Sequence, residues 1–103
     1  MRAMIPSRLR SAQVRYLRGL AHALKPVVQL GQSGLTPAVL RAIEEALLAH
    51  ELIKVRLSGE DRAARAAAAA RIVAATGAME VQILGHVLSL YRPHPDKPRL
   101  SPP

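Results

Sequence analysis

The chain has 103 residues, which is enough for one domain and too few for a multidomain enzyme. It carries 15 Lys and Arg against 7 Asp and Glu, a formal net charge of +8, and no acid precedes Glu44. It has no cysteine, which excludes disulfides, thiolate metal sites and a cysteine nucleophile. Such an excess of positive charge on a small domain indicates a polyanionic partner.

No segment has the length of a membrane span. The apolar runs stay far below the roughly 18 residues that a span requires, and Met1–Pro6 lacks the apolar centre of a secretory signal. An Arg-rich start without acids would suit an organellar transit peptide, but it leads directly into patterned sequence. We therefore expect a cytoplasmic protein that does not insert into membranes.

Two elements are predicted before residue 31. Apolar positions from Ser7 to His22 recur at helical spacing among arginines, which is typical of a basic amphipathic helix. Gly19 lies inside this pattern and costs about 1 kcal/mol relative to alanine, so the helix is expected to weaken or end there. The run Lys25–Leu30 has a proline near its start, is otherwise short and apolar, and predicts a buried strand.

A helix and a second strand are predicted after the glycine-containing segment Gly31–Gly34. Thr36 is a favourable N-cap and Pro37 suits the first helical position, so a helix is expected to begin there and to end near His50. Apolar and basic side chains alternate from Leu52 to Leu57. This alternation predicts a strand with one solvated, basic face.

A third helix is predicted in an alanine-rich stretch. Ser58 followed by Asp61 three residues later resembles a capping box, and the composition through Thr76 has high helix propensity. Gly77 supplies the C-terminal stop. The basic residues of this helix either extend a basic surface or simply keep it soluble: Arg62, Arg65 and Arg71.

The chain is then predicted to close with a hairpin and a tail. Alternating strands at Met79–Ile83 and Val87–Arg92 flank the dipeptide Gly85-His86, which suits a two-residue type II′ turn. Strand-helix-strand units favour right-handed crossovers and parallel pairing. Residues 7–92 are therefore predicted to form an α/β, two-layer domain of order α-β-α-β-α-β-β with a four-stranded mixed sheet. Residues 93–103 form a Pro-rich basic tail, expected to be extended or flexible.

The segment Gly31-Gln32-Ser33-Gly34 is the strongest candidate site. Backbone N–H groups and the positive end of the helix dipole converge where a strand leads into a helix, and the first turn of this helix carries no acid. Alone, the Gly-x-x-Gly spacing indicates only a tight connection. In a basic neighbourhood it favours phosphate binding, and these residues would supply the charge: Lys25, Lys54, Arg56, Arg8, Arg15 and Arg18.

The motifs of common enzymes are missing from the sequence. The loop matches neither a Walker nor a Rossmann pattern, and Leu35 stands where the hydrolase elbow around Ser33 would need glycine. The four histidines are not at metal-ligand spacings. We therefore predict a protein without catalytic activity, cofactor, metal or small-molecule substrate.

Among polyanions, structured RNA is favoured. Two tyrosines cannot build the stacking platform that reads single strands, and no pattern of a helix-turn-helix or zinc finger offers a major-groove reader. The alternative is an adaptor whose basic first helix docks on an acidic protein partner.

Six short segments between Arg18 and Pro93 carry a resemblance to a known family: Gly19-Leu20-Ala21-His22, Leu24-Lys25-Pro26-Val27-Val28, Gly31-Gln32-Ser33-Gly34-Leu35-Thr36, His50-Glu51-Leu52-Ile53-Lys54-Val55, Thr76-Gly77-Ala78 and Leu90-Tyr91-Arg92-Pro93. In this order they resemble the YhbY family, the bacterial stand-alone form of the CRM (chloroplast RNA splicing and ribosome maturation) domain.

The resemblance implies an RNA-binding domain whose fold is similar to the C-terminal domain of translation initiation factor three. It also implies association with precursors of the large ribosomal subunit in the bacterial cytoplasm. The family's RNA-contacting loop maps onto Gly31–Gly34, with Lys25 and Lys54 as matching basic positions. Because Gln32 and Ser33 are uncharged, contact through the loop backbone is implied, and the N-terminal helix is expected to supply the missing charge. The resulting hypothesis is a monomeric protein that binds rRNA and assists assembly.

Overall fold

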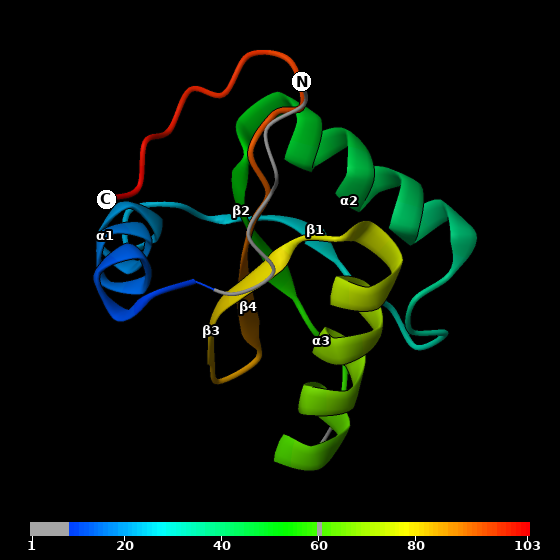
Figure 1. Ribbon diagram of the computed structural model, residues 1–103. Coiled ribbons are helices and arrows are strands. Elements are labelled where there is room, and N and C mark those ends of the chain that lie inside the picture. Colours follow the sequence, from blue (N-terminus) through cyan, green and yellow to red (C-terminus); the bar gives the residue numbers. More distant parts are fainter. Residues whose placement is uncertain (1–8, 60) are drawn as a thin grey trace.

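The computed structural model describes residues 9–59 and 61–103 (Figure 1). The order α-β-α-β-α-β-β is confirmed, and its elements are α1 (Ser11–Ala21), β1 (Pro26–Gln29), α2 (Pro37–His50), β2 (Leu52–Arg56), α3 (Arg62–Thr76), β3 (Met79–Leu84) and β4 (Val87–Tyr91).

The four strands form one mixed sheet in the order β1-β2-β4-β3. β1 runs parallel to β2, and β4 is antiparallel to both of its neighbours. The predicted mixed sheet with one antiparallel strand is therefore confirmed. The hairpin places β4 between β2 and β3, so these two strands run in the same direction without being neighbours.

Helices lie on both faces of the sheet. α2 and α3 cover one face, where Ile53 and Val55 of β2 join the larger hydrophobic core. α1 packs against part of the opposite face, on Leu52, Met79 and Tyr91, and Figure 1 shows it across the sheet from the other two helices. The two-layer description fits the sheet with α2 and α3, and α1 adds a partial third layer.

The first helix differs from its predicted bounds. It begins at Ser11, whereas the predicted start at Ser7 lies outside the described residues. It also continues through Gly19 to Ala21. Leu17 and Ala21 are both 0% exposed, and the burial of these side chains outweighs the local cost of the glycine because packing supplies most helix stability in proteins.

β1 corrects the prediction of a buried strand at Lys25–Leu30. It is an edge strand in which Pro26, Val27 and Gln29 are exposed and Val28 is half-buried. The pairing with β2 shifts register between Pro26 and Val28. A short apolar run in a sequence suggests a buried strand, but the position of the strand in the sheet decides whether its side chains are buried. A proline at the first residue suits an edge strand.

Helix ends agree with local signals, with one correction. The N-cap of α3 is Asp61, whose side chain accepts a hydrogen bond from the backbone N–H of Ala64 at 2.7 Å, so Ser58 is not the cap. Gly77 ends α3 in the left-handed conformation at φ 72°, as predicted. Gly85 has φ 62° at the first central position of the hairpin turn, as a type II′ turn requires.

The tail, residues 93–103, contains no helix or strand and is held against the domain. The carboxylate of Glu51, a residue that is 0% exposed, accepts hydrogen bonds from the backbone N–H groups of His94, Arg99 and Leu100 at 2.7, 2.9 and 2.9 Å. The Arg99 guanidinium also donates to the carbonyl of Ala49 at the end of α2. The sequence did not indicate this attachment.

Candidate nucleic-acid interface

The glycine loop lies at the edge of the sheet where β1 and β2 end. The backbone N–H of Leu30 donates to the carbonyl of Arg56 at 2.9 Å, which fixes the start of the loop beside the end of β2. The N–H of Leu57 donates to the carbonyl of His86 at 2.6 Å, which brings the β3–β4 turn to the same edge. We call this region the loop edge: Gly31–Gly34, Arg56 and the turn Gly85-His86.

The loop is a tight exposed turn. The N–H of Gly34 donates to the carbonyl of Gly31 at 3.0 Å, and Gly34 has φ 71°, which favours glycine. Gly31 has no positive φ, and a Cβ placed on it would meet open space. Glycine is therefore required by the loop conformation only at Gly34, whereas at Gly31 it leaves room for a ligand to approach.

Of the four backbone amides from Gln32 to Leu35, which we expect to meet a phosphate, three are available to one. Those of Gln32, Ser33 and Leu35 have no hydrogen-bond partner among the described residues, and the side chains of Gln32 and Ser33 are exposed. The amide of Gly34 is the exception, because it closes the turn. An anion at this site would therefore meet amides on either side of Gly34.

The start of α2 adds to the positive potential of the loop. Thr36 is the N-cap, as predicted, and its hydroxyl oxygen accepts a hydrogen bond from the N–H of Val39 at 3.2 Å. Pro37 occupies the beginning of the helix, and the first turn holds no acid. The helix dipole places partial positive charge at this end, and no carboxylate on the first turn neutralises it.

Lys54 and Arg56 share one face of β2, on the part of the sheet that α1 leaves uncovered. A shallow hollow of about 140 Å³ there is lined by Pro26, Lys54, Arg56, Gln82, Leu84, Val87 and Ser89. The Lys54 ammonium donates to the carbonyl of Leu24 at 3.0 Å. Arg56 is exposed and has no side-chain partner among the described residues. The predicted basic face of this strand is confirmed, and Arg56 is its available cation.

Two arginines of α3 join the loop edge. A hollow of about 440 Å³ is lined by Arg62, Arg65, Ala66, Ile83 and Gly85. One guanidinium nitrogen of Arg65 lies 3.5 Å from the Gly59 carbonyl oxygen and 3.5 Å from His86 Nε2. The sequence left the role of Arg62 and Arg65 open, because only the position of the hairpin turn shows that this end of α3 lies beside the loop edge.

The remaining predicted cations are not gathered there. Arg15 and Arg18 are exposed on α1, which packs near Leu52 at the opposite end of β2 from Arg56. Four residue steps along the strand separate Leu52 from Arg56 by about 13 Å. Lys25 is exposed just before β1, and Arg8 lies outside the described residues. The predicted site is therefore divided between the loop edge and α1.

Two kinds of feature are not found in the described part of the chain. Within residues 9–59 and 61–103, no helix has the length and apolar character needed to cross a membrane. In the same residues, no group of three or more histidines and carboxylates could hold a metal ion.

The fold and the charge distribution define a small, basic α/β domain with an exposed glycine loop between a strand and a helix. Residues 9–92 match the CRS1 / YhbY (CRM) domain, and the chain belongs to this family. The resemblance found in the six sequence segments is thereby confirmed.

Relatives of the chain carry names that refer to RNA. A Haemophilus influenzae protein named RNA-binding protein is 52% identical over 85 residues, 82% of this chain and 86% of the relative. A Pseudomonas aeruginosa protein, named a probable RNA-binding protein, is 37% identical over 87 residues, 84% of each chain. The solution structure of a Staphylococcus aureus protein, described as a candidate RNA-binding protein, has a TM-score of 0.80 at 29% identity and covers 97% of this chain and 100% of its own. The likeness to the C-terminal domain of translation initiation factor three stays a prediction.

Proposed function

We propose that this protein binds ribosomal RNA in precursors of the large subunit and assists their assembly, as a cytoplasmic monomer that catalyses no reaction. The names of its relatives support RNA as the partner. The observation that carries the proposal is the loop edge, where loop amides and the guanidinium of Arg56, none of them with a partner in the described part of the chain, meet the start of α2.

This arrangement suits a phosphate of the RNA backbone. The amides of Gln32, Ser33 and Leu35 would donate to phosphate oxygens, as helix N-termini do in other anion sites. Arg56 would pair with the same or the next phosphate. Because the loop side chains carry no charge, contact depends on backbone and shape, which fits recognition of structured RNA.

The arginines of α1 would contact the RNA at a second place. Arg15 and Arg18 are exposed and distant from the loop, so they would reach phosphates further along the RNA. If about five phosphates are neutralised in total, the logarithm of affinity falls against the logarithm of salt concentration with a slope between roughly −3.5, the value for a single strand, and roughly −4.5, the value for a duplex.

Gly31→Asp tests the loop. It adds a carboxylate where a Cβ meets open space and φ is not positive, so the fold is expected to be unaffected. Affinity for large-subunit rRNA fragments should fall at least tenfold, because the new charge repels phosphate. Fluorescence anisotropy at 150 mM salt measures affinity, and thermal unfolding confirms that the variant is folded.

Ala70→Asp is the matched control, because it makes the same change of net charge at an exposed position within α3. Its affinity should stay within twofold of the parent. Equal losses in the two variants would mean that net charge alone drives binding, and unchanged affinity in Gly31→Asp would remove the loop from the site. Equal affinity for small-subunit rRNA fragments would contradict the assignment to the large subunit.

One observation keeps a second function in consideration. Because Arg15 and Arg18 are exposed away from the loop edge, α1 could dock on an acidic protein instead of RNA. Pull-down with and without ribonuclease separates the two functions. Partners lost on RNA digestion support RNA binding, and a partner that survives digestion and is lost in Arg15→Gln supports the adaptor.

A further inference from the structure

A line of exposed apolar side chains runs along α1 and into β1. Tyr16, Leu20 and Leu24 follow one another at intervals of four residues and are each 38–39% exposed, and Val27 is 53% exposed. Tyr16 and Leu20 lie on one side of α1, because residues four apart share a helix face, and Leu24 lies in the segment that follows the helix. Leu20, Leu24 and Val27 of this line meet around one pocket, and exposed apolar side chains gathered in this way mark an interaction site.

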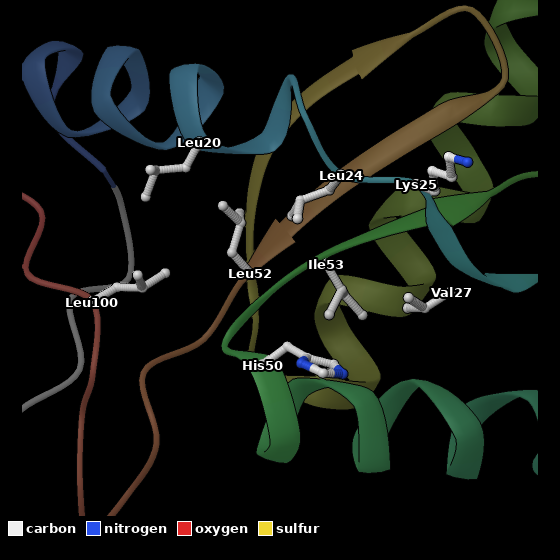
Figure 2. Close-up of a pocket in the computed structure, with 8 residues that line it drawn as sticks. All are labelled: Leu20, Leu24, Lys25, Val27, His50, Leu52, Ile53 and Leu100. Carbon is white, nitrogen blue, oxygen red and sulfur yellow. The ribbon is translucent and has the colours of Figure 1, made fainter.

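The patch borders a pocket of about 470 Å³. Figure 2 shows its walls: Leu20 and Leu24 from α1 and the segment after it, Val27 from β1, His50 from α2, and Leu100 from the tail. Leu52, Ile53 and Lys25 complete the lining. The size lies within the range of pockets that bind ligands, and the lining is mainly aliphatic.

The pocket is separate from the loop edge. It lies where β2 begins, at Leu52 and Ile53, whereas the loop edge lies where β2 ends, at Arg56. Leu20 lies on the pocket side of α1, and Arg18 lies about 160° away around the helix. A ligand in the pocket therefore leaves the proposed phosphate site free.

The chain's own tail does not fill the pocket. Leu100 contributes one wall, but its backbone N–H is bonded to the buried carboxylate of Glu51, which also holds the amides of His94 and Arg99. Moving the tail further into the pocket would break these bonds. The tail shapes the pocket and leaves it open.

The charges around the pocket indicate the kind of partner. Among the described residues that line it, only Lys25 and His50 can carry charge, and both are basic. A second copy would bring two chains of net charge +8 together, which opposes self-association. We propose that the pocket receives aliphatic side chains from an acidic, amphipathic segment of a partner protein, with its carboxylates near Lys25 and His50. The segment would dock as an amphipathic helix docks in a groove.

The test uses a synthetic peptide as the probe. It has about 16 residues, with leucines at helical spacing and glutamates elsewhere. Binding to the isotope-labelled full chain is followed by NMR titration. We expect shifts at the amides of Leu24, Val27 and Leu52, and at least tenfold weaker binding when the peptide's glutamates are replaced by glutamine.

Two matched variants place the binding site. Leu24→Gln combined with Val27→Thr makes the patch polar without changing charge, and both side chains are more than a third exposed, so the fold is expected to persist. This variant should lose peptide binding at least tenfold and keep its affinity for rRNA fragments. Leu84→Gln, at a residue 71% exposed on the uncovered part of the sheet, should bind the peptide like the parent.

The outcomes are distinguishable from those of the loop experiment. Gly31→Asp should leave peptide binding unchanged, so a failure of RNA binding does not affect this test. The proposal is overturned if the peptide does not bind, or if it binds the patch variant as tightly as it binds Leu84→Gln. It is also overturned if the patch variant abolishes self-association or binding to phosphatidylglycerol vesicles instead, since a second copy or a lipid surface would then be the occupant.

Discussion

The two ends of β2 use the same residue types for different purposes. Where β2 begins, Arg92 donates from one guanidinium nitrogen to Glu44 and to the carbonyl of Thr76, at distances of 2.7 to 3.0 Å. Where β2 ends, Arg56 is exposed and has no partner among the described residues. A cation that the fold already pairs stabilises the fold, and an unpaired one is available to a ligand.

Backbone groups show the same difference. The amides of His94, Arg99 and Leu100 all donate to buried Glu51, whereas those of Gln32 and Ser33 in the loop donate to no described group. One end of the sheet is therefore closed by internal hydrogen bonds, and at the other end backbone amides have no partner in the described part of the chain. The comparison predicts which substitutions change stability and which change binding.

Glu51→Ala should have the largest effect. It leaves three backbone amides without an acceptor and releases the tail, which should cost about 3 kcal/mol of the free energy of unfolding. Urea denaturation measures the loss. Under conditions where the variant is folded, its affinity for rRNA fragments should match the parent, and a selective loss of affinity in fully folded protein would contradict the division between the two ends.

Arg92→Ala and Arg56→Ala should have opposite effects. Arg92→Ala removes a half-buried ion pair and a bond to Thr76, and should cost about 2 kcal/mol without weakening RNA binding. Arg56→Ala should leave the unfolding midpoint unchanged and weaken RNA binding several-fold. The salt dependence of its affinity should correspond to about one phosphate contact fewer than in the parent. Denaturation and anisotropy on both variants measure these effects. Equal effects of the two substitutions on stability and on affinity would contradict the difference between the two ends of β2.

Acid should destabilise the end of the sheet where β2 begins, which Glu51 holds together. Burial raises the pKa of Glu51, but hydrogen bonds from the backbones of His94, Leu100 and Arg99, with the charge of Arg99, bring it below the usual 4.5. A carboxyl group whose pKa is lower in the folded than in the unfolded state stabilises the fold at pH values above its unfolded pKa. This contribution is lost as the pH falls through the folded pKa. Stability measured from pH 6 to pH 3 should therefore fall less steeply in Glu51→Gln than in the parent.

Much of the fold could be predicted because its signals are local. Thr36 and Pro37 begin α2, Gly77 ends α3, and alternation marks β2, and each of these acts within a few residues. The exposure of β1 could not be predicted. It follows from β4 entering the sheet beside β2, which leaves β1 at the edge.

The candidate site divides in the same way. The loop and the face of β2 that carries Lys54 and Arg56 follow from local pattern, and the structure places the loop beside Arg56. The distance of Arg15 and Arg18 from the loop follows from the packing of α1 on the opposite face from α2 and α3, a long-range arrangement without a local signal.

The two loop glycines give the smallest expected effect and the finest distinction. Gly34→Ala must adopt φ 71° and should cost about 1 kcal/mol, whereas Gly31→Ala meets open space and should cost nothing measurable. If the backbone at Gly31 lies close to an RNA phosphate, the added methyl group weakens binding even though it leaves stability unchanged. Thermal unfolding and anisotropy on both variants therefore separate a glycine needed by the fold from one needed by the ligand. Parental affinity in Gly31→Ala would mean that RNA does not approach the backbone at this residue.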